Sequence, residues 1–430
     1  MKRHLIGIGG VGMSALATAL LRLGDEVTGA DRTLGTPNIK FLESLGVKVY
    51  PDDGSGVDKS TDEVIVSTAI EETNAGLIRA KELGIPVTHR AKALARTLKD
   101  YRLVAVVGTC GKSTVTAMLG HVLAECGLDP MCVNGANVPG WEGAVRFGRG
   151  KYAVAEVDES DKSLVAFSPY AAIVTNASAD HYSKEEMDEV FDAFVKDCEG
   201  PVIDGRKSGE LSDCLHCLDC LNLEVPVPGN HNLQNAQLAV AMAVKLGCAL
   251  PSVIAAMKTF RGVERRLQLI TPAIKQSQIK QSNNQTIKQF PAVYDDYAHN
   301  PEKLKAMWTT LAEKHPEGIC VIWRPHGYAP LRKMMDALAV MFAETVRSCD
   351  KLLLLPVYDA GGTTDRSVSS SDLLEKVKVR GEGEQRIELV SDLDAAYDWC
   401  AAHRGDFAAF VTCGARDPGL PVLAKRLSEM

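Results

Sequence analysis

One glycine-containing turn constrains the fold of this chain more than any other segment. It reads Gly108-Thr-Cys-Gly-Lys-Ser-Thr114, follows the apolar run Leu103–Val107, and precedes a helical pattern that starts at Val115. A buried strand, a glycine turn and a helix in this order are typical of a parallel α/β sheet. The glycines let backbone N–H groups turn inward on phosphate oxygens. The sequence therefore predicts an α/β protein that binds a nucleoside triphosphate at this turn.

The side chains of this turn match the roles that a triphosphate site requires. Lys112 is expected to reach the outer phosphates, and the hydroxyl of Ser113 or Thr114 is expected to hold Mg²⁺. The common pattern has a glycine five residues before Gly111, where this chain has Val106, so the turn is an abbreviated form. The predicted phosphate-binding residues are Gly108, Thr109, Gly111, Lys112, Ser113 and Thr114.

A second glycine turn, Gly7-Ile-Gly-Gly-Val-Gly12, lies near the N-terminus. A predicted strand at His4–Ile8 leads into it, and a helix at Met13–Leu23 and a strand at Glu26–Ala30 follow, the strand ending at Asp31. An acid about twenty residues after such a turn is typical of a dinucleotide-binding βαβ unit. Chemistry alone therefore indicates NAD or a similar dinucleotide. We expect residues 1–99 to form a Rossmann-like domain.

The central block, residues 100–264, places polar residues at the ends of two more predicted strands, Tyr152–Val157 and Ala171–Thr175. Open α/β sheets bind their ligands at the carboxyl ends of strands, so these polar residues should gather near the phosphates. They are Glu156, Asp158, Asn176 and His181. Helices are predicted at Asn230–Leu246 and Pro251–Thr259.

The third block, residues 265–430, again alternates strands and helices. Its stretch Thr271–Gln289 is rich in Gln, Asn and Lys and is expected to be a solvated loop. Strands are predicted at Ala292–Asp296, Ile319–Trp323, Lys351–Pro356 and Phe407–Thr412, and a helix at Leu331–Thr345. The predicted fold is thus α/β with three domains: an N-terminal Rossmann-like domain, a central phosphate-loop ATPase domain with a parallel or mixed sheet, and a C-terminal Rossmann-like domain. Two nucleotide turns indicate an enzyme that brings two phosphorylated ligands together.

Composition narrows the partners and the compartment. The chain has 48 Lys and Arg against 55 Asp and Glu, a net charge of −7, and no long basic stripe, so nucleic acid is not an expected partner. Its 12 Cys are too sparse for a disulfide scaffold, which favours a reducing cytoplasm. The N-terminus has the charge and apolar run of a secretory signal, but its closely spaced glycines favour a nucleotide turn. No segment approaches the ~20 apolar residues that a membrane span needs, so membrane insertion is not expected.

Seven short motifs, spread in order over all three blocks, resemble those of the Mur ligase family. They are Gly7-Ile-Gly-Gly-Val-Gly-Met-Ser14, Gly108-Thr-Cys-Gly-Lys-Ser-Thr114, Glu156-Val-Asp-Glu-Ser-Asp161, Thr175-Asn-Ala-Ser-Ala-Asp-His181, Gly229-Asn-His-Asn-Leu-Gln-Asn235, Arg265-Arg266 and Asp295-Asp-Tyr-Ala-His-Asn-Pro301. Within the family, the chain most resembles the branch that joins L-alanine to UDP-N-acetylmuramate.

This resemblance implies ATP-dependent amide-bond synthesis in the cytoplasmic stage of peptidoglycan assembly. The lactyl carboxylate of UDP-N-acetylmuramate would attack the γ-phosphate of ATP to give an acyl phosphate. The amine of an amino acid, L-alanine in this branch, would then attack the acyl phosphate and release phosphate. Two Mg²⁺ ions and nearby cations would shield the repelling anions. An alternative within the family is the recycling ligase, which attaches a whole peptide to the same sugar nucleotide. The expected assembly is a monomer or a weak homodimer.

The resemblance also assigns residues by their positions in the motifs. The implied catalytic residues are Lys112, Glu156, His181, Arg265 and His326, and the implied Mg²⁺ ligands are Ser113, Thr114, Glu156 and His181. The implied ATP contacts outside the phosphate loop are Asn232, Asn235, Arg265, Asp296 and Tyr297. The first glycine turn would hold the diphosphate of the UDP-sugar rather than NAD, through Gly7, Gly9, Gly10, Gly12, Asp31, Ser67 and Arg90. Purely structural roles are the alternatives: His181 at a helix start, Asn232 and Asn235 as N-caps, and Asp295 and Asp296 at a strand end.

Several positions depart from the alanine-adding branch. Cys110 stands where that branch usually has His, and Gly327 and Pro330 replace two arginines expected near the carboxylate of the amino acid. Gly and Pro have no side chain that binds an anion, so the added amino acid is left open. The segment between residues 200 and 228 is short and contains Cys214, His216, Cys217 and Cys220, which have the crowding of a zinc site but lack a second C-x-x-C.

Two other classes of function fit parts of the sequence. An NAD-dependent oxidoreductase would explain the first glycine turn but not Lys112, Glu156 or Asn232. A nucleotide-gated binding protein would explain both turns without needing a catalytic metal pair at Glu156 and His181.

Overall fold

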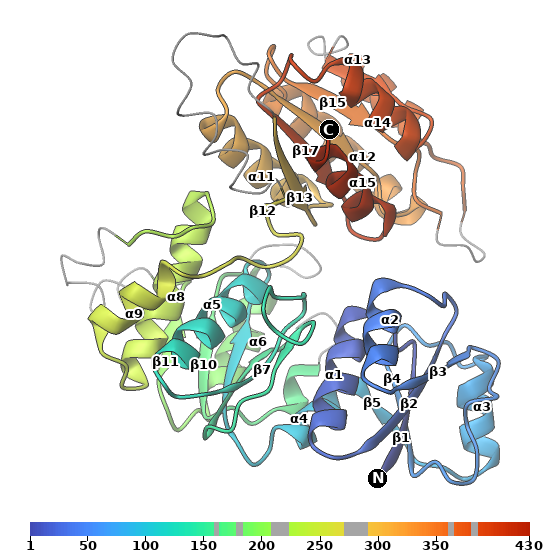
Figure 1. Cartoon of the computed structure of the whole chain (residues 1–430), viewed down its shortest axis with the longest axis vertical. Coiled ribbons are helices and arrows are strands. Elements are labelled where there is room, and N and C mark those ends of the chain that lie inside the picture. The colour runs from blue at the N-terminus through green and yellow to red at the C-terminus, as the bar shows by residue number, and fades with distance from the viewer. Residues whose placement is uncertain (159–162, 178–183, 208–222, 271–290, 360–364, 380–385) are drawn as a thin grey trace. The chain divides into compact units, whose positions relative to one another are not determined.

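The computed structural model describes residues 1–158, 163–177, 184–207, 223–270, 291–359, 365–379 and 386–430 (Figure 1). Within them the chain forms three α/β sheets, as the sequence predicts. Two compact units contain these sheets. The first unit, Met1–Pro226 with His231–Val263, holds the first two sheets, and the second unit, Val227–Asn230 with Glu264–Met430, holds the third. The expected domain boundaries at residues 99 and 264 stay a prediction.

The first sheet is parallel, and its described strands run in the order β3-β2-β1-β4-β5. Leu5 and Ile6 of the central strand face opposite sides and are both fully buried, because helices cover both faces. The elements are β1 (Lys2–Ile6), α1 (Val11–Arg22), β2 (Glu26–Asp31), α2 (Pro37–Ser44), β3 (Lys48–Pro51), β4 (Glu63–Val66), α3 (Ala75–Glu82), β5 (Val87–His89) and α4 (Arg90–Thr97).

The second sheet is mixed, and its described strands run in the order β11-β10-β6-β9-β7-β8. All pairs are parallel except β7 with β8, which are antiparallel. Its elements are β6 (Arg102–Val107), α5 (Lys112–Glu125), β7 (Met131–Val133), β8 (Val145–Arg146), β9 (Tyr152–Glu156), the 3₁₀ turn η1 (Ser163–Ala166), β10 (Ala171–Val174), α6 (Lys184–Val195), β11 (Val202–Asp204), α8 (Asn230–Lys245) and α9 (Leu250–Met257).

The first two sheets share one hydrophobic core. Leu16 and Leu20 of α1 belong to the same buried cluster as Val145 of β8, and Arg22 of α1 pairs with Glu142 at 2.6 Å. Helix α4, which follows the last strand of the first sheet, also packs against η1, which lies between two strands of the second. The first unit is therefore one body that carries both glycine turns.

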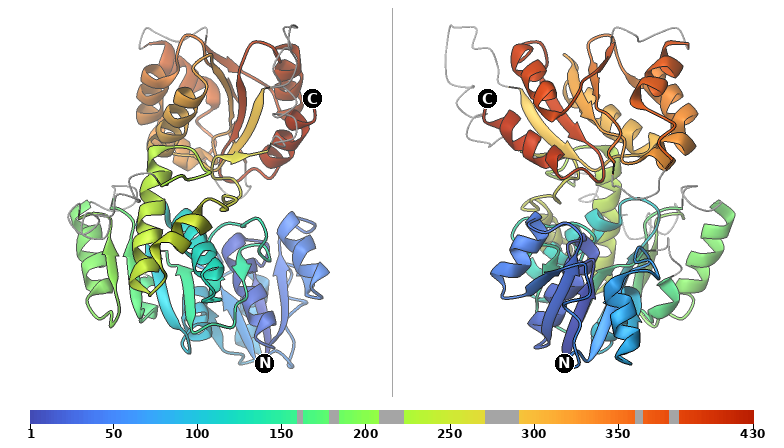
Figure 2. Two further views of the ribbon diagram at one scale, coloured as in Figure 1. Left: turned by 60° about the vertical axis from the view of Figure 1, so that its left-hand side comes forward. Right: turned by 90° about the vertical axis from the view of Figure 1, so that its right-hand side faces the viewer.

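The third sheet also has helices on both faces (Figure 2). Its described strands run in the order β12-β13-β17-β14-β15-β16, parallel except for β12 with β13. Alternate residues of β14 enter different cores: Val321 packs with α11, α12 and α13, whereas Ile322 packs with α14 and α15. The elements are β12 (Gln268–Leu269), β13 (Ala292–Asp296), α11 (Pro301–Lys314), β14 (Ile319–Trp323), α12 (Tyr328–Thr345), β15 (Lys351–Leu354), α13 (Ser370–Lys378), β16 (Ile387–Leu389), α14 (Leu393–Ala402), β17 (Ala409–Cys413) and α15 (Gly419–Ser428).

Two expected helix starts lie three residues later than in the structure. Helix α5 starts at Lys112 rather than Val115, because the last residues of the phosphate-loop motif form the first helical turn. Helix α12 starts at Tyr328 rather than Leu331, since Pro330 lies in the first turn, where its missing N–H breaks no helical hydrogen bond. The polar stretch Thr271–Gln289 and the cysteine cluster around Cys214 lie outside the described residues.

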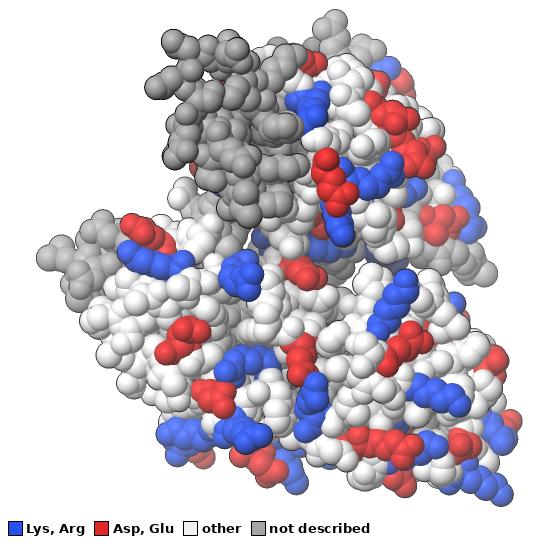
Figure 3. Space-filling view, in the orientation of Figure 1, with Lys and Arg blue, Asp and Glu red and all other residues white. Residues whose placement is uncertain are grey.

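The surface shows interspersed charges. On the face in Figure 3, Lys and Arg alternate with Asp and Glu over both units. In the part of the chain that the structure describes, no helix combines the length and apolar character needed to cross a bilayer.

His4 makes the stability of the first sheet sensitive to acid. It is 1% exposed on β1, its Nδ1 lies 2.9 Å from the Thr28 hydroxyl, and burial lowers its pKa from 6.5 to about 4. The unfolded chain therefore takes up this proton first as the pH falls, so stability present above pH 6.5 is lost towards pH 4. We expect a loss of about 2 kcal/mol between pH 6.5 and 4.5. Hydrogen exchange of β1 amides, corrected for intrinsic rates, measures it.

The variant His4→Asn is the matched control, because it offers Thr28 a hydrogen-bonding group that does not titrate. It should lose much less protection over the same pH range. Equal losses in the two proteins would contradict the assignment to His4.

Candidate active site

Two positions of the phosphate loop between β6 and α5 require glycine. Gly108 and Gly111 have φ of +128° and +84°, which other residues rarely adopt. A Cβ on Gly108 would lie 2.1 Å from the Thr175 hydroxyl, and one on Gly111 would lie 2.4 Å from the Asn235 side-chain oxygen. The close approach of β10 and α8 to the loop therefore explains both glycines.

Asn176, immediately after β10, clamps the loop through a pair of amide hydrogen bonds. The backbone N–H of Cys110 donates to Asn176 Oδ1, and Asn176 Nδ2 donates to the Cys110 carbonyl, both at 2.9 Å. The Thr175 hydroxyl donates to the same carbonyl at 2.6 Å. The clamp uses only the backbone of Cys110, so it holds the same loop shape whether position 110 is Cys or His.

The start of α5 supplies the positive groups. Lys112 Nζ donates to the Gly108 carbonyl at 2.6 Å, so the ammonium lies over the loop. Ser113 and Thr114 are buried in the first turn, where backbone N–H groups lack intrahelical acceptors and the helix dipole favours an anion. A cradle that a Cβ would fill, with an ammonium above it, fits the phosphates of ATP.

Glu156 lies at the same edge of the sheet as this loop. It ends β9, whose register pairs Val106 with Glu156, and its Oε2 accepts from the Gly135 N–H at 2.8 Å. A carboxylate here and the Ser113 hydroxyl are oxygen ligands of the kind that Mg²⁺ prefers. His181, the implied ligand of a second Mg²⁺, lies outside the described residues.

Two residues beside Glu156 escaped the sequence analysis. Asn134 and Gly135 follow β7, and the Asn134 side-chain oxygen also accepts from the Gly135 N–H at 3.0 Å. Asn134 is 2% exposed, yet within the described residues its Nδ2 has no hydrogen-bond partner. A Cβ on Gly135 would lie 2.4 Å from Glu156. The sequence signal that could have found them is a polar residue, Asn134, directly after the apolar run Met131–Val133, because Glu156 likewise stands at the end of an apolar strand.

Asn232 and Asn235 lie one turn apart in α8 and are both buried. Asn235 Nδ2 donates to Asn232 Oδ1 at 3.4 Å, and the Asn235 oxygen faces Gly111. The structure therefore places Asn235 against the phosphate loop itself. The implied contact with adenine stays a proposal.

The first glycine turn is held by an acid. Asp31, at the end of β2, accepts from the Gly9 N–H at 2.9 Å and from the Thr33 N–H at 3.0 Å. Asn38 Nδ2 donates to the Gly9 carbonyl at 2.9 Å. Because the Gly9 N–H is already used, binding of an anion at this turn depends on other donors.

Arg90 is such a donor. It begins α4 after β5, and its Nη1 would lie 3.1 Å from a Cβ on Gly12. Within the described residues, no ion pair engages its guanidinium. Ser67 follows β4, which lies next to β1 in the sheet, so Gly7, Gly10, Ser67 and Arg90 belong to one carboxyl edge. This edge fits a diphosphate.

Arg265, Asp295 and Asp296 form a structural network in the second unit. Arg265 Nε pairs with Asp295 at 3.0 Å, and its Nη atoms donate to the carbonyls of Gly414 and Ala415. Asp296 accepts from the N–H groups of Leu267 and Ala298, at 2.6 and 2.7 Å. Asp295 and Asp296 thus make the contacts expected of acids with a structural role at a strand end. Contacts of Arg265 and Asp296 with ATP stay proposals.

Tyr297 and His326 lie near this network on the loops after β13 and β14. The Tyr297 ring has the Arg265 and Arg266 guanidinium carbons 5.3 and 4.9 Å from its centroid. The His326 ring contacts the His299 ring, with centroids 4.8 Å apart. Burial, with help from Arg416 and Lys303, lowers the pKa of His326 to about 4, so the ring is neutral at pH 7.

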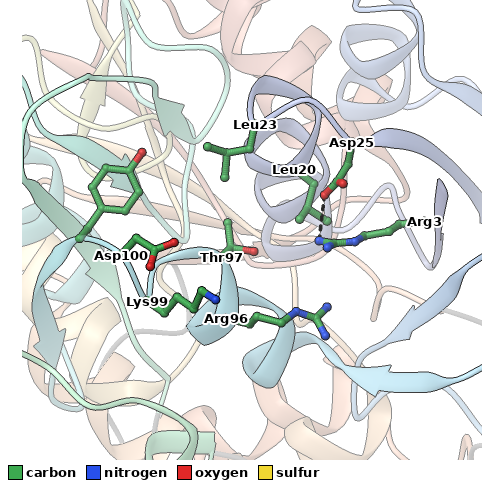
Figure 4. A pocket seen from close by; sticks show the side chains of 9 residues that line it. Arg3, Leu20, Leu23, Asp25, Arg96, Thr97, Lys99 and Asp100 are labelled. Carbon is green, nitrogen blue, oxygen red and sulfur yellow. Dashed lines mark ion pairs between the residues drawn. The ribbon is translucent and has the colours of Figure 1, made fainter. Parts of the chain in front are cut away.

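A separate cavity of about 470 Å³ lies at the amino ends of β1 and β2 (Figure 4). Arg3, Arg96 and Lys99 line it, and Arg3 pairs with Asp25 at 3.0 Å. The glycine turn follows the carboxyl end of β1, so this cavity is not part of the candidate site.

Comparison with known proteins identifies the family. Residues 2–102 match the Mur ligase family, catalytic domain, and residues 283–416 match the Mur ligase glutamate ligase domain. The UDP-N-acetylmuramate–L-alanine ligase of Desulforamulus reducens is 31% identical over 100% of this chain and 98% of its own length. The chain belongs to the Mur ligase family. It is therefore an ATP-dependent amide ligase of peptidoglycan synthesis, as the seven motifs predicted.

Two crystal structures of Mur ligases show the same fold. UDP-N-acetylmuramate-alanine ligase from Thermotoga maritima superposes with a TM-score of 0.79 at 25% identity, covering 100% of this chain and 98% of the other. A murein peptide ligase from Psychrobacter arcticus superposes with a TM-score of 0.66 at 20% identity, covering 99% and 98%.

The clamp on Cys110 gives a prediction for nucleotide binding by this Mur ligase. Asn176→Ala removes two hydrogen bonds worth about 1 kcal/mol each, so affinity for ATP should fall about 30-fold. Thr175→Val removes one hydrogen bond without changing side-chain shape and should cost about 5-fold. Isothermal titration with Mg²⁺ and a non-hydrolysable ATP analogue measures both. Affinities within twofold of the parent, in folded variants, would refute the role of the clamp.

Proposed function

We propose that this Mur ligase joins the lactyl carboxylate of UDP-N-acetylmuramate to the amine of an amino acid, L-alanine. The observation that carries the proposal is the full-length similarity to UDP-N-acetylmuramate–L-alanine ligases. The first unit supports it, because Arg90 beside Gly12 provides a cation for the diphosphate of the sugar nucleotide.

The reaction has two steps. The carboxylate attacks the γ-phosphorus of ATP and ADP leaves, which gives an acyl phosphate. The neutral amine then attacks the acyl carbon, phosphate leaves, and the amide nitrogen loses a proton. ATP supplies the phosphoryl group that activates the carboxylate, and Mg²⁺ neutralises charge as the anions approach.

The residues of the first unit have defined parts in this proposal. Lys112 and the start of α5 hold the phosphates and offset their charge. Ser113, Thr114 and Glu156 hold one Mg²⁺, and His181 holds a second. Because Mur ligases act in the cytoplasmic stage of peptidoglycan assembly, we propose that this enzyme works in the cytoplasm, as a monomer or weak homodimer.

The murein peptide ligase activity is a second candidate. Gly327 and Pro330 favour it, because the resemblance implies arginines at these two positions in the alanine-adding branch. The structural likeness to the Psychrobacter arcticus enzyme shows the fold alone.

The proposal predicts strict dependence on all substrates. Phosphate release from ATP and Mg²⁺ should rise at least tenfold only when UDP-N-acetylmuramate and an amino acid are both present, since the acyl phosphate is consumed by the amine. A panel of amino acids, with L-alanine, glycine, L-serine and a murein tripeptide, measures the preference. Phosphate release that does not depend on the amine would rule out the ligase mechanism. Phosphate release that responds to the tripeptide but to none of the amino acids would favour the second candidate.

The role of Glu156 predicts a loss of turnover without loss of fold. Glu156→Gln keeps an oxygen for the Gly135 N–H but removes the charge, so kcat should fall about 10²- to 10³-fold. The same change at Glu125, at the far end of α5, is the control and should leave kcat unchanged. Steady-state phosphate release at saturating Mg²⁺ tests both; normal turnover of the Glu156 variant would remove it from the metal site.

A further inference from the structure

The loop after β17 is fixed from both sides. Arg265 donates to the carbonyls of Gly414 and Ala415, the second at 3.3 Å. Arg324 Nη1 pairs with Asp417 at 2.6 Å, and both side chains are largely buried. The backbone between these anchors, at residue 416, is therefore held in place.

Arg416 projects from this anchored loop. It is exposed, and within the described residues no ion pair joins it to a carboxylate. The adjacent acid, Asp417, forms its ion pair with Arg324. An arginine on a fixed backbone, with no acidic partner among the described residues, is suited to binding an anion from solution, because its guanidinium presents paired donors that match a carboxylate.

The Arg416 side chain lies close to a glycine. Arg416 Nη1 lies 3.9 Å from where a Cβ on Gly327 would be. Gly327 has no side chain, so the guanidinium lies over the start of α12, in space that a larger residue at 327 would contest. This is also one of the two positions at which the alanine-adding branch has arginine.

A second cation lies near the same histidine as Arg416. The charged groups that act on the neighbouring His326 ring are Arg416 and Lys303, and both lower its pKa. The His299 ring contacts His326. These residues follow β13, β14 and β17, which lie side by side in the order β13-β17-β14. They therefore meet at the carboxyl edge of the sheet, where open α/β sheets bind ligands.

We propose that Arg416 binds the carboxylate of the incoming amino acid and so selects a free amino acid over an amide or a peptide-bonded residue. The inference rests on the proposed function for the identity of the nucleophile. The cation that the substrate needs comes from the β17 loop in this enzyme, rather than from the loop before α12.

The test compares L-alanine with L-alaninamide, which has the same amine but no carboxylate. Arg416→Ala should raise KM for L-alanine about 10- to 100-fold, with kcat within threefold and KM for ATP unchanged. The KM for L-alaninamide should stay the same, so the preference for the acid disappears. Arg416→Lys should keep part of it, because Lys offers one charge without the paired donors.

Arg426→Ala is the matched control. Arg426 is on α15, exposed and paired with Asp394 at 2.7 Å, so its loss should change neither KM. If Arg416→Ala leaves KM for L-alanine and the acid-to-amide preference unchanged, the inference is overturned while the ligase function stands. If the parent enzyme shows no amino-acid-dependent turnover, the proposed function fails first, and the assignment of Arg416 falls with it.

Discussion

The parallel pairing of β6 with β9 on one side and β10 on the other brings three strand ends to one edge of the second sheet. The phosphate loop follows the first strand, Glu156 ends the second, and Asn176 follows the third. A shift of one residue in either pair would turn these side chains to the opposite face. The geometry of the site thus depends on the register, and the register depends on the apolar residues that bury both faces of these strands.

The sequence predicted strand bounds best where every residue of the strand is buried. Ala292–Asp296 and Ile319–Trp323 are strands with the expected bounds, because both faces of the third sheet are covered by helices. The two-residue strands β8 and β12 escaped prediction, since pairing with a neighbour, rather than local pattern, makes them strands. The start of α5 was placed late because Lys112 and Ser113 belong to a motif and a helix at once.

The sequence named candidate site residues but could not give their contacts. Motifs named Lys112 and Glu156, and the family resemblance added Arg90, but neither could show that the Gly9 N–H donates to Asp31 or that Arg265 holds the loop after β17. Such contacts join residues far apart in the chain, and a single sequence carries no signal for them. For the same reason the sequence did not point to Arg416. Its neighbour Gly327 was noted only as a position that lacks an expected arginine.

The common core of the first two sheets has a consequence for how enzymes of this shape can be recombined. Leu16 and Leu20 of α1 contribute to the same buried cluster as Val145 of β8, so a cut at the linker near residue 99 would expose apolar surface on each fragment. Exchange of the first sheet and its helices alone would require compatible surfaces on α1 and β8. The third sheet, with cores of its own on both faces, is the piece that can be exchanged at lower cost in stability. If Arg416 has the role proposed above, new amine specificities would be easier to acquire by replacing or altering this last part than by rebuilding the first two.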